Sequence, residues 1–456
     1  MKNKERLFWL FSTMLLAAYS FFPFEKAKAI SLEGEKFLQV FHEISALIDS
    51  DFVETSEDKN LYQGAIKGMI STLGDPHTRF MDEEEFKQLQ EETRGSFGGV
   101  GMEVAPTEGG ILVVAPIDDT PAQRAGVQPQ DKIIEINGQS TEKMSIQDAI
   151  KIMRGAPGTS VNLKIRRKSV KDPVSLSLVR EQIRIQFLKK AFLENEKLGY
   201  IRLSQFMGKE GTLNEFKKIL GELKAKNMKG LIVDLRSNPG GLLDLAIELS
   251  DLFLPENKDI VSVKGRGEKL IRVFKSTGRQ DKYTDIPMIV LMNGGSASAS
   301  EIFAGAMQDH KRASILGTQS FGKGSVQNIY PLSYKTGIAL TIQKYYTPSG
   351  VSIHKKGITP DIATEAFGPD EDEKFYLDKM HKANLLPAFV KEHPGFNERN
   401  LDLFIEILQK KSIRIRPELA RYLLKREYSV GEKLPIFDRE FDVQLNKAIE
   451  VLSQNK

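Results

Sequence analysis

The pattern of apolar and polar positions divides the chain into five parts. Residues 1–29 contain one long apolar run, and in residues 30–92 apolar positions recur three and four apart, as in amphipathic helices. Residues 93–170 change to short alternating stretches separated by glycine turns, which predict strands and hairpins. Residues 171–365 alternate strand and helix patterns, and residues 366–456 are polar and helical. We therefore expect a multidomain chain with helical segments at both ends.

The alternation in residues 171–365 predicts the core fold. Short apolar runs are interleaved with stretches whose apolar positions recur at helical spacing. This arrangement is typical of a layered α/β fold with largely parallel strands. The strand patterns lie at 200–203, 230–235, 288–292 and 337–346, and the helix patterns lie at 215–223 and 242–253.

Helices are also expected outside this core. The predicted helices lie at 37–48, 61–73, 83–92, 145–154, 401–408, 417–426 and 441–452. The N-terminal helices are too few to bury much surface alone, so we expect them to pack on the body or on a partner chain. The C-terminal helices carry no catalytic constellation.

Candidate chemistry lies where the strand at 288–292 ends. A tight Asn-Gly-Gly turn follows, then three serines, Ser296, Ser298 and Ser300, and then a helix pattern. The start of a helix offers free N–H groups and the positive end of the dipole, which suit an attacking oxygen and the oxyanion that it creates. Spacing alone does not choose between the serines, and Ser300 is also a candidate helix cap.

A lysine in the next loop is a candidate base. Lys323 lies between two glycines and follows Phe321. A neutral amine can activate a serine, but the pKa of free lysine, about 10.4, must fall by about three units, and burial without a carboxylate partner lowers it. Gln327 is neutral and can position the amine without raising its pKa. Glu301, on the first helical turn, is expected to favour the helix dipole.

Other catalytic arrangements fit less well. No G-x-S-x-G elbow is present, and neither His77 nor His354 has an obvious carboxylate to orient it in a Ser-His-Asp triad. His42-Glu43 lacks the second histidine of a zinc helix. The loop from Gly317 to Gly324 resembles a phosphate-binding loop but lacks its final Ser or Thr. We therefore expect no metal and no cofactor.

Composition limits the partners and the compartment. The net charge of +4 is small and does not indicate the concentrated basic face of a nucleic-acid-binding protein, so a nucleic-acid partner is not expected. The chain has no cysteine and therefore no disulfide. The N-terminus combines basic residues, the apolar run 7–24 and the small-x-small sequence 27–29. These features predict a signal peptide, or an N-terminal anchor if it stays uncleaved. The body of the protein is thus expected outside the cytoplasm, in the periplasm or at the membrane.

The glycine-rich segment resembles a PDZ domain. Its motifs in order are Gly-Val-Gly-Met-Glu-Val at 99–104, Pro-Ala-Gln-Arg-Ala-Gly at 121–126 and Asp-Lys-Ile-Ile-Glu-Ile-Asn-Gly at 131–138. PDZ domains add a peptide strand to a sheet edge and hold its C-terminal carboxylate in backbone N–H groups. The resemblance implies that Gly99, Val100, Gly101 and Met102 form this loop. A plain spacer barrel is the alternative.

Further motifs resemble the carboxyl-terminal processing proteases, the tail-specific PDZ serine peptidases of family S41. They are Asn-Gly-Gly-Ser-Ala-Ser-Ala-Ser-Glu-Ile at 293–302, Phe-Gly-Lys-Gly-Ser-Val-Gln at 321–327, Asp-Leu-Arg-Ser-Asn-Pro-Gly-Gly at 234–241, Lys-Tyr-Tyr-Thr-Pro-Ser-Gly at 344–350 and Gly-Ile-Thr-Pro-Asp at 357–361. The resemblance implies a crotonase- or ClpP-like core with an inserted PDZ domain, Ser298 as nucleophile, Lys323 as base and Gln327 orienting it.

One of the two hydrogen-bond donors to the oxyanion is predicted from its position in the sequence. The Ala299 N–H comes directly after the nucleophile, as in other strand–turn–helix serine sites. The family implies a second donor in the glycine turn after strand 230–235, at Gly240 or Gly241. A plain turn is the alternative for these glycines.

We therefore expect an exported serine endopeptidase that cleaves protein substrates with apolar C-termini. The PDZ domain would recognise those C-termini, and the helical segments at both ends are candidates for homodimer formation. A non-catalytic PDZ scaffold and an acyl-CoA enzyme of the crotonase type are the two alternatives.

Overall fold

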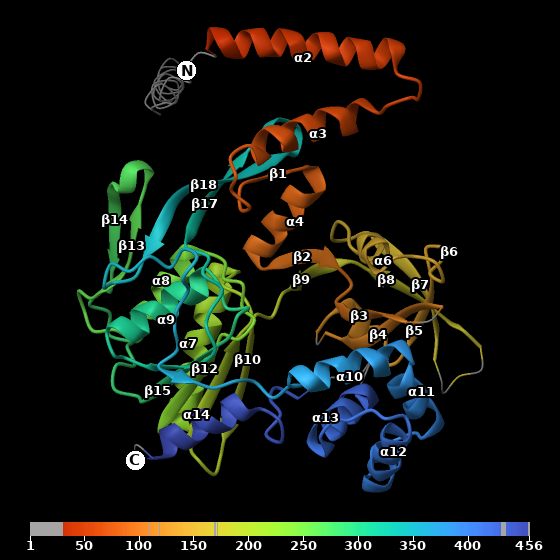
Figure 1. Cartoon of the computed structure of the whole chain (residues 1–456), viewed down its shortest axis with the longest axis vertical. Helices are drawn as coiled ribbons and strands as arrows, with labels where there is room; N and C mark the ends of the chain where they lie inside the picture. Colours follow the sequence, from red (N-terminus) through yellow and green to blue (C-terminus); the bar gives the residue numbers. More distant parts are fainter. Residues whose placement is uncertain are drawn as a thin grey trace, which may run out of the picture. The chain divides into compact units, whose positions relative to one another are not determined.

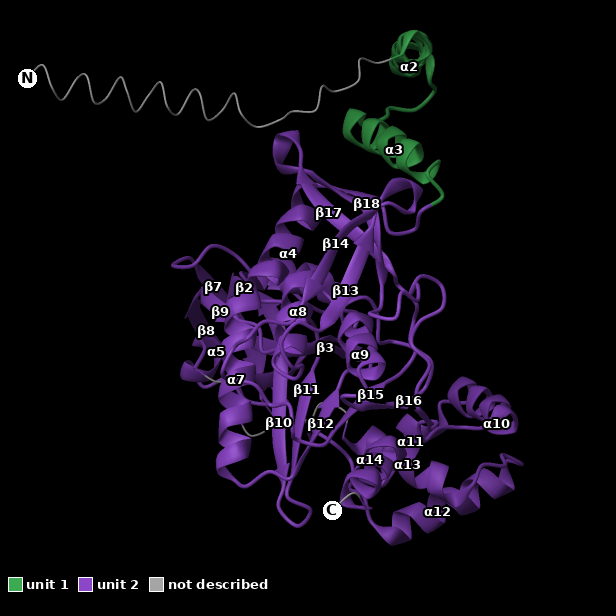
Figure 2. Ribbon diagram, turned by 90° about the vertical axis from the view of Figure 1, so that its left-hand side faces the viewer, with its two compact units in different colours: residues 1–74 green, residues 75–456 purple. Residues whose placement is uncertain are grey.

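The computed structural model describes residues 31–454, except 108, 118, 168, 169, 171 and 430–434. The predicted leader, residues 1–29, lies outside this range. The chain divides into two compact units, residues 1–74 and residues 75–456 (Figure 2).

The first unit consists, in its described part, of two helices, α2 (Leu32–Asp51) and α3 (Asp58–Ser71). The Ser31 hydroxyl caps α2 by accepting a hydrogen bond from the third residue of the helix, Gly34. Among the side chains of α2 and α3 only Ile70 is buried, so these helices have no core of their own. In the described part of the chain, we find no helix with both the length and the apolar surface that crossing a bilayer requires.

The core of the second unit is a six-stranded sheet in the order β10-β11-β12-β15-β16-β19. Every neighbouring pair is parallel except β10 and β11, which confirms the predicted layered α/β fold with largely parallel strands. The bounds are β10 Leu188–Leu193, β11 Leu198–Leu203, β12 Gly230–Asp234, β15 Met288–Met292, β16 Ser314–Gly317 and β19 Ile362–Ala363.

Helices cover both faces of this sheet (Figure 1). On one face, three phenylalanine rings, Phe216, Phe253 and Phe303, meet edge to face at centroid distances of 6.2 and 6.0 Å. The opposite face is covered by the last helix of the chain, whose side chains pack on those of β12 and β15. The helices are α7 (Lys209–Ala225), α8 (Leu243–Asp251) and α9 (Ala299–Asp309) on the first face and α14 (Val443–Gln454) on the second.

A second, antiparallel sheet stands beside this core, in the order β1-β18-β13-β14 with β17 also paired to β18. It joins the segment at 79–81 to strands more than 170 residues away in the sequence. The sequence predicted its longest strand, at 337–346, and extended chain at 326–330, which lies within β17. The bounds are β1 Arg79–Met81, β13 Asp259–Lys264, β14 Leu270–Lys275, β17 Ser325–Pro331 and β18 Gly337–Tyr346.

The segment predicted as a PDZ domain forms its own sheet and core. The strand order is β3-β4-β5-β7-β8, with β6 paired to β5, and the sheet continues past residue 170 because β8 pairs with β7. Its helix α6 begins one residue after the Ser145 cap. The bounds are β3 Met102–Thr107, β4 Gly110–Pro116, α5 Pro121–Arg124, β5 Lys132–Ile136, β6 Gln139–Ser140, α6 Ile146–Met153, β7 Ser160–Arg166 and β8 Val174–Val179.

The remaining elements connect or follow these domains. Strands β2 and β9 form a separate antiparallel pair, with β2 near the start of the predicted PDZ segment and β9 beyond its predicted end at residue 170. Helices α10 to α13 enclose a separate small core around Phe404. The bounds are α4 Glu83–Arg94, β2 Ser96–Gly99, β9 Glu181–Arg184, α10 Glu371–Lys382, α11 Leu385–Glu392, α12 Glu398–Lys410 and α13 Pro417–Tyr428.

Candidate active site

The turn between β15 and α9 holds Ser298 in an unusual conformation. Its backbone has φ 55° and ψ −111°, a region that L-residues rarely adopt and that costs about 1–3 kcal/mol. The buried strand β15 and the buried helix α9 impose this conformation from both sides. Ser298 is only 6% exposed. It is the N-cap of α9, so the alternative that Ser300 caps this helix is wrong.

The other two serines of the turn serve its structure. The Ser296 hydroxyl donates to the Leu235 carbonyl at 2.8 Å, and the Ser300 hydroxyl donates to the Asn238 carbonyl at 3.0 Å. Both hydroxyls are buried and tie the turn to the segment after β12. Among the three, Ser298 is the one for which no such bond to a carbonyl occurs within the described residues.

A tyrosine lies against Ser298. Burial raises the pKa of Tyr345 to about 12, while a hydrogen bond between its side chain and that of Ser298 acts in the opposite direction. The Tyr345 N–H also donates to the Gly324 carbonyl at 2.7 Å, beside Lys323. The sequence analysis did not single out this tyrosine as a site residue, and its only signal was its place in the motif at 344–350.

Gly240 lies in direct contact with the serine turn. With φ 97°, it adopts a conformation that favours glycine, and a Cβ there would lie 2.8 Å from the Ser298 Cβ and 2.6 Å from the Ala297 carbonyl oxygen. No other residue fits at this position without moving the turn. The glycine therefore allows the two loops to approach each other.

The backbone donors near Ser298 differ in availability. The Gly240 N–H donates to the Asn238 side-chain oxygen at 2.9 Å. By contrast, neither the Gly241 N–H nor the Ala299 N–H has a hydrogen-bond partner in the part of the chain that the structure describes. Of the predicted oxyanion donors, Ala299 and Gly241 thus have N–H groups that remain available.

Lys323 lies in the loop between β16 and β17 and is mostly buried. The pKa of its amine lies below the ordinary value, because burial disfavours the charged form and Arg79 adds repulsion. The charges of Asp75 and Glu301 act in the opposite direction. Burial is the cause that the sequence suggested, but Phe321 does not provide it, since its side chain is 61% exposed.

Gln327 lies on β17, and its side-chain amide is hydrogen-bonded to two hydroxyl groups. Its amide nitrogen donates to the Ser325 hydroxyl at 2.7 Å and to the Thr341 hydroxyl at 3.2 Å. Within the described residues, no hydrogen bond joins Lys323 to Gln327 or to Ser298. The predicted roles of these side chains remain predictions.

Glu301 does more than interact with the helix dipole. Its side chain is fully buried and accepts hydrogen bonds from both the serine turn and the lysine loop. Burial raises the pKa of this carboxyl, and its four hydrogen-bond donors act against that rise. The sequence analysis missed this contact because the donors come from a loop about twenty residues further along the chain.

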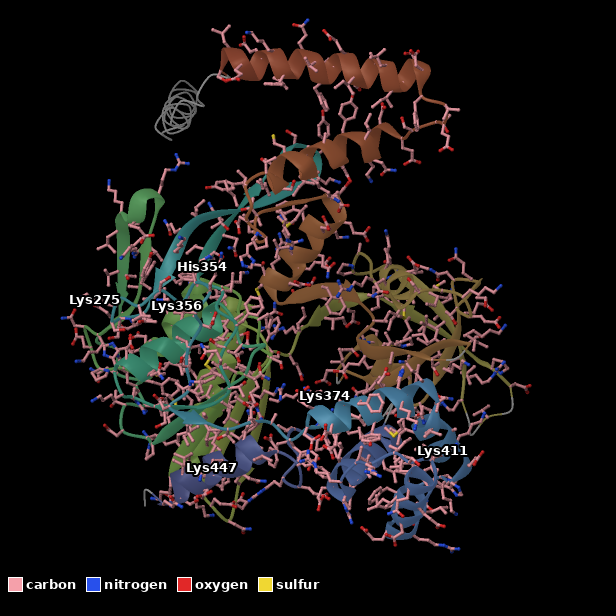
Figure 3. All side chains as sticks on the ribbon, in the orientation of Figure 1. Lys275, His354, Lys356, Lys374, Lys411 and Lys447 are labelled. Carbon is pink, nitrogen blue, oxygen red and sulfur yellow. The ribbon has the colours of Figure 1, made fainter. Side chains whose placement is uncertain are left out.

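Two histidines lie near the lysine loop. Burial lowers the pKa of His77, and the charge of Lys323 lowers it further. His354, labelled in Figure 3, lies after β18, and its backbone contacts the position of Gly324. Within the described chain, neither imidazole is hydrogen-bonded to Ser298 or to a carboxylate, and we find no group of three or more His, Cys, Asp or Glu side chains suited to a metal ion.

A groove of about 420 Å³ lies in the segment predicted as a PDZ domain. The four predicted loop residues, 99–102, line it together with Ile150 and Met153 of α6. At its end the Arg154 guanidinium stacks on Phe97, 4.4 Å from the ring centroid. A groove between a strand edge and a helix, with a glycine loop at one end, has the form required for a peptide strand.

Comparison with known families identifies the class of protein. The model of peptidase family S41 matches residues 197–364, that of the PDZ domain matches residues 112–167, and that of the activating protease CtpB N-terminal domain matches residues 22–85. The S41 match contains the turn and the lysine loop described above.

Two relatives that match in sequence give the same result. The chain is 43% identical over 353 residues to a carboxy-terminal-processing protease of Bartonella bacilliformis, with 76% of this chain and 80% of the relative covered. It is 37% identical to the carboxy-terminal processing protease CtpA of Bacillus subtilis, with 75% and 72% covered. A solved photosystem II D1 C-terminal processing protease is similar at 28% identity and a TM-score of 0.43, with 71% and 86% covered.

The chain therefore belongs to the carboxy-terminal processing proteases, serine-type peptidases of family S41 that carry a PDZ domain.

Proposed function

We propose that this protein is an endopeptidase in which Ser298 is the nucleophile and Lys323 the general base. The observation that carries the proposal is the lysine itself, whose pKa is lowered by burial in the loop that Glu301 ties to the serine turn. A neutral amine is the form that can accept the serine proton. The Ser296 and Ser300 hydroxyls are bound to backbone carbonyls. The side chain of Ser298 is hydrogen-bonded to that of Tyr345, and its unusual backbone also supports its choice as nucleophile.

The reaction proceeds through an acyl-enzyme. The Ser298 oxygen attacks the carbonyl carbon of the scissile bond while its proton passes to the Lys323 amine, giving a tetrahedral intermediate. The amine then returns this proton to the departing amino group as the C–N bond breaks. A water molecule, deprotonated by the same amine, attacks the ester and releases the new C-terminus and the serine.

The negative oxygen of the intermediate is stabilised by the backbone. The available N–H groups of Ala299 and Gly241 are the proposed donors. Gly240 allows the loop that contains Gly241 to approach the serine. Each such donor contributes about 3–4 kcal/mol in comparable sites. Gln327 is proposed to orient the amine, for which its side-chain amide must leave the Ser325 and Thr341 hydroxyls.

The PDZ groove is proposed to select the substrates. The glycine loop 99–102 would hold a free C-terminal carboxylate, and the apolar side chains of Ile150 and Met153 favour an apolar terminal residue. Peptide binding there is also proposed to switch the protease. Deletion of residues 96–184, which run from the start of β2 to the end of β9, should abolish any response to C-terminal peptides.

The proposal also includes the cellular compartment and the oligomeric state that the sequence predicts. The chain is proposed to be exported to the periplasm or another extracytoplasmic compartment, and an uncleaved N-terminus would attach it to the membrane. The exposed apolar side chains of α2, which include Phe37 and Ile44, support a homodimer formed through the first unit. Cell fractionation tests the location, and light scattering of the mature chain tests the dimer.

The central experiment measures degradation of an unfolded, apolar-tailed protein by purified variants. We expect Ser298→Ala and Lys323→Ala to lose at least 10³-fold in kcat, because each removes a group that the chemical step requires. Ser296→Ala and Lys356→Ala are the matched controls, since Ser296 serves the turn and the Lys356 side chain is exposed. Both controls should keep activity.

Activity close to that of the wild type in Ser298→Ala would contradict the proposal and move the nucleophile to another residue. Inactivity of the wild-type chain towards every substrate, with peptides still bound by the PDZ domain, would favour the non-catalytic scaffold.

A further inference from the structure

Glu301 is the third residue of α9 and is completely buried. Isolated buried carboxylates are unfavourable unless their oxygens accept hydrogen bonds, and the number of such bonds here is unusually high. Four donors converge on this single side chain. An acidic residue that only interacts favourably with the helix dipole needs none of these four hydrogen bonds.

The two oxygens of the carboxylate connect separate loops. Oε2 accepts from the Ser298 N–H at 2.7 Å and from the Lys323 N–H at 2.9 Å. Oε1 accepts from the Gly322 N–H and from the Ser320 hydroxyl, each at 2.6 Å. One side chain thus holds the backbone of the proposed nucleophile and that of the proposed base.

We propose that Glu301 is a positioning residue whose carboxylate sets the distance and orientation between Ser298 and Lys323. The proposal rests on the Ser298/Lys323 dyad proposed above. Glu301 touches neither the substrate nor the transferred proton. It acts through the two backbone N–H groups that share Oε2.

The geometry predicts graded effects of substitution. Glutamine can keep one oxygen at the position of Oε2, but its NH₂ group then faces the Gly322 N–H, so one hydrogen bond is lost. Alanine removes all four bonds and leaves buried N–H groups without a partner. We therefore expect kcat to fall about tenfold in Glu301→Gln and at least a hundredfold in Glu301→Ala, with little change in KM.

The same carboxylate has a second, electrostatic consequence. The charges of Glu301 and Asp75 raise the pKa of the Lys323 amine, whereas burial and the charge of Arg79 lower it. His77 is the other titratable group that faces this lysine. Removing the charge of Glu301 lowers the pKa of Lys323, so the neutral amine persists to lower pH. The acid limb of the kcat profile should therefore move to lower pH in Glu301→Gln even though the rate falls.

The experiment measures kcat, KM and the pH profile of the full mature chain on an unfolded protein substrate, with the melting temperature of each variant. Glu373→Gln is the matched control. Glu373 is also a buried third residue of a helix, accepting backbone bonds from Asp370 at 3.1 Å and Arg416 at 2.8 Å, but it lies on α10 outside the core. Glu373→Gln should lose stability while keeping both kcat and the pH profile of the wild type.

A graded loss of kcat with a shifted acid limb supports the positioning role. Wild-type kcat in Glu301→Ala would overturn it. A loss of activity that simply follows the melting temperature, with the acid limb unmoved, would also overturn it and leave Glu301 as a purely structural residue. The proposal that Ser298 and Lys323 form the catalytic dyad is tested separately, because retained activity in Ser298→Ala would contradict it.

Discussion

Lys323 illustrates how several weak influences combine at one residue. Burial and Arg79 lower the pKa of its amine, whereas Asp75 and Glu301 raise it, and the net direction is downward. None of these partners is adjacent to the lysine in the sequence, and Arg79 comes from β1, about 240 residues earlier. The reactivity of the amine therefore depends on the second sheet as well as on its own loop.

This balance predicts the pH response of an Arg79→Gln variant. The amine is active when neutral, so the rate rises with pH through the pKa of Lys323. Removing the Arg79 cation favours the protonated amine and raises that pKa, so the acid limb of kcat should move to higher pH. The measurement is the pH profile of kcat.

Arg94→Gln provides the control for this prediction. Arg94 is an exposed arginine in the last turn of α4, and it is not among the charges that shift the pKa of Lys323. Its profile should match that of the wild type. An unmoved or downward-shifted limb in Arg79→Gln would show that Arg79 does not act on the base.

At the scale of elements, the last helix supports the strand that leads into the glycine turn. Asp234, at the end of β12, is fully buried and accepts from the Tyr200 hydroxyl at 2.6 Å. Burial alone would raise the pKa of Asp234, but the hydrogen bonds and charge of Arg236 hold it below its usual value. The same guanidinium binds Asp442, just before α14, through two bonds of 2.6 and 2.7 Å.

This ion pair predicts a stability effect far from the serine. Asp442→Asn removes one charged partner of a largely buried arginine, and breaking such a pair costs about 3 kcal/mol. We expect a corresponding fall in the free energy of unfolding, measured by urea denaturation. Glu406→Gln is the control, because its pair with Lys410 is on the surface, where it is screened by solvent, and its loss should leave the free energy of unfolding nearly unchanged. Equal losses in the two variants would contradict the structural role of Arg236.

At the scale of the whole molecule, the chain combines a protease core with a separate peptide-binding domain. The PDZ sheet has its own buried core around Ile133 and Ile165, so its groove does not depend on the core sheet for its shape. The first unit is a further separate part with little buried surface in its described helices. Division of this kind allows recognition and cleavage to be tested one at a time.

The predicted recognition mode can be measured on the full chain carrying Ser298→Ala. A labelled peptide with an apolar C-terminal residue should bind, and the same peptide with an amidated C-terminus should bind at least tenfold more weakly, because the loop 99–102 loses a carboxylate acceptor for its N–H groups. Fluorescence polarisation gives both affinities. Equal affinities would exclude recognition of the free C-terminus.

The local pattern of the chain correctly predicted the elements that frame the site. The apolar run 288–292 forms strand β15, the helix after the serines forms α9, and the alternation of residues 171–365 forms a mostly parallel sheet. These predictions succeeded because burial of a short apolar run and helical periodicity are properties of neighbouring residues. The family of the protein was predicted in the same way, from motifs that are short and contiguous.

Only the tertiary structure decided which distant groups meet at those elements. It brings Arg79, Tyr345 and the carboxylate of Glu301 to the serine and the lysine, and it leaves Phe321 exposed, so that other parts of the chain bury the lysine. It also places α14 on the core sheet. Such contacts form between residues that are far apart in the sequence and are brought together only when the sheets and loops pack. Neither periodicity nor a short motif contains information about that packing. The chain by itself therefore determined the chemical groups and their local frame, whereas folding determined their surroundings and hence their pKa values and positions.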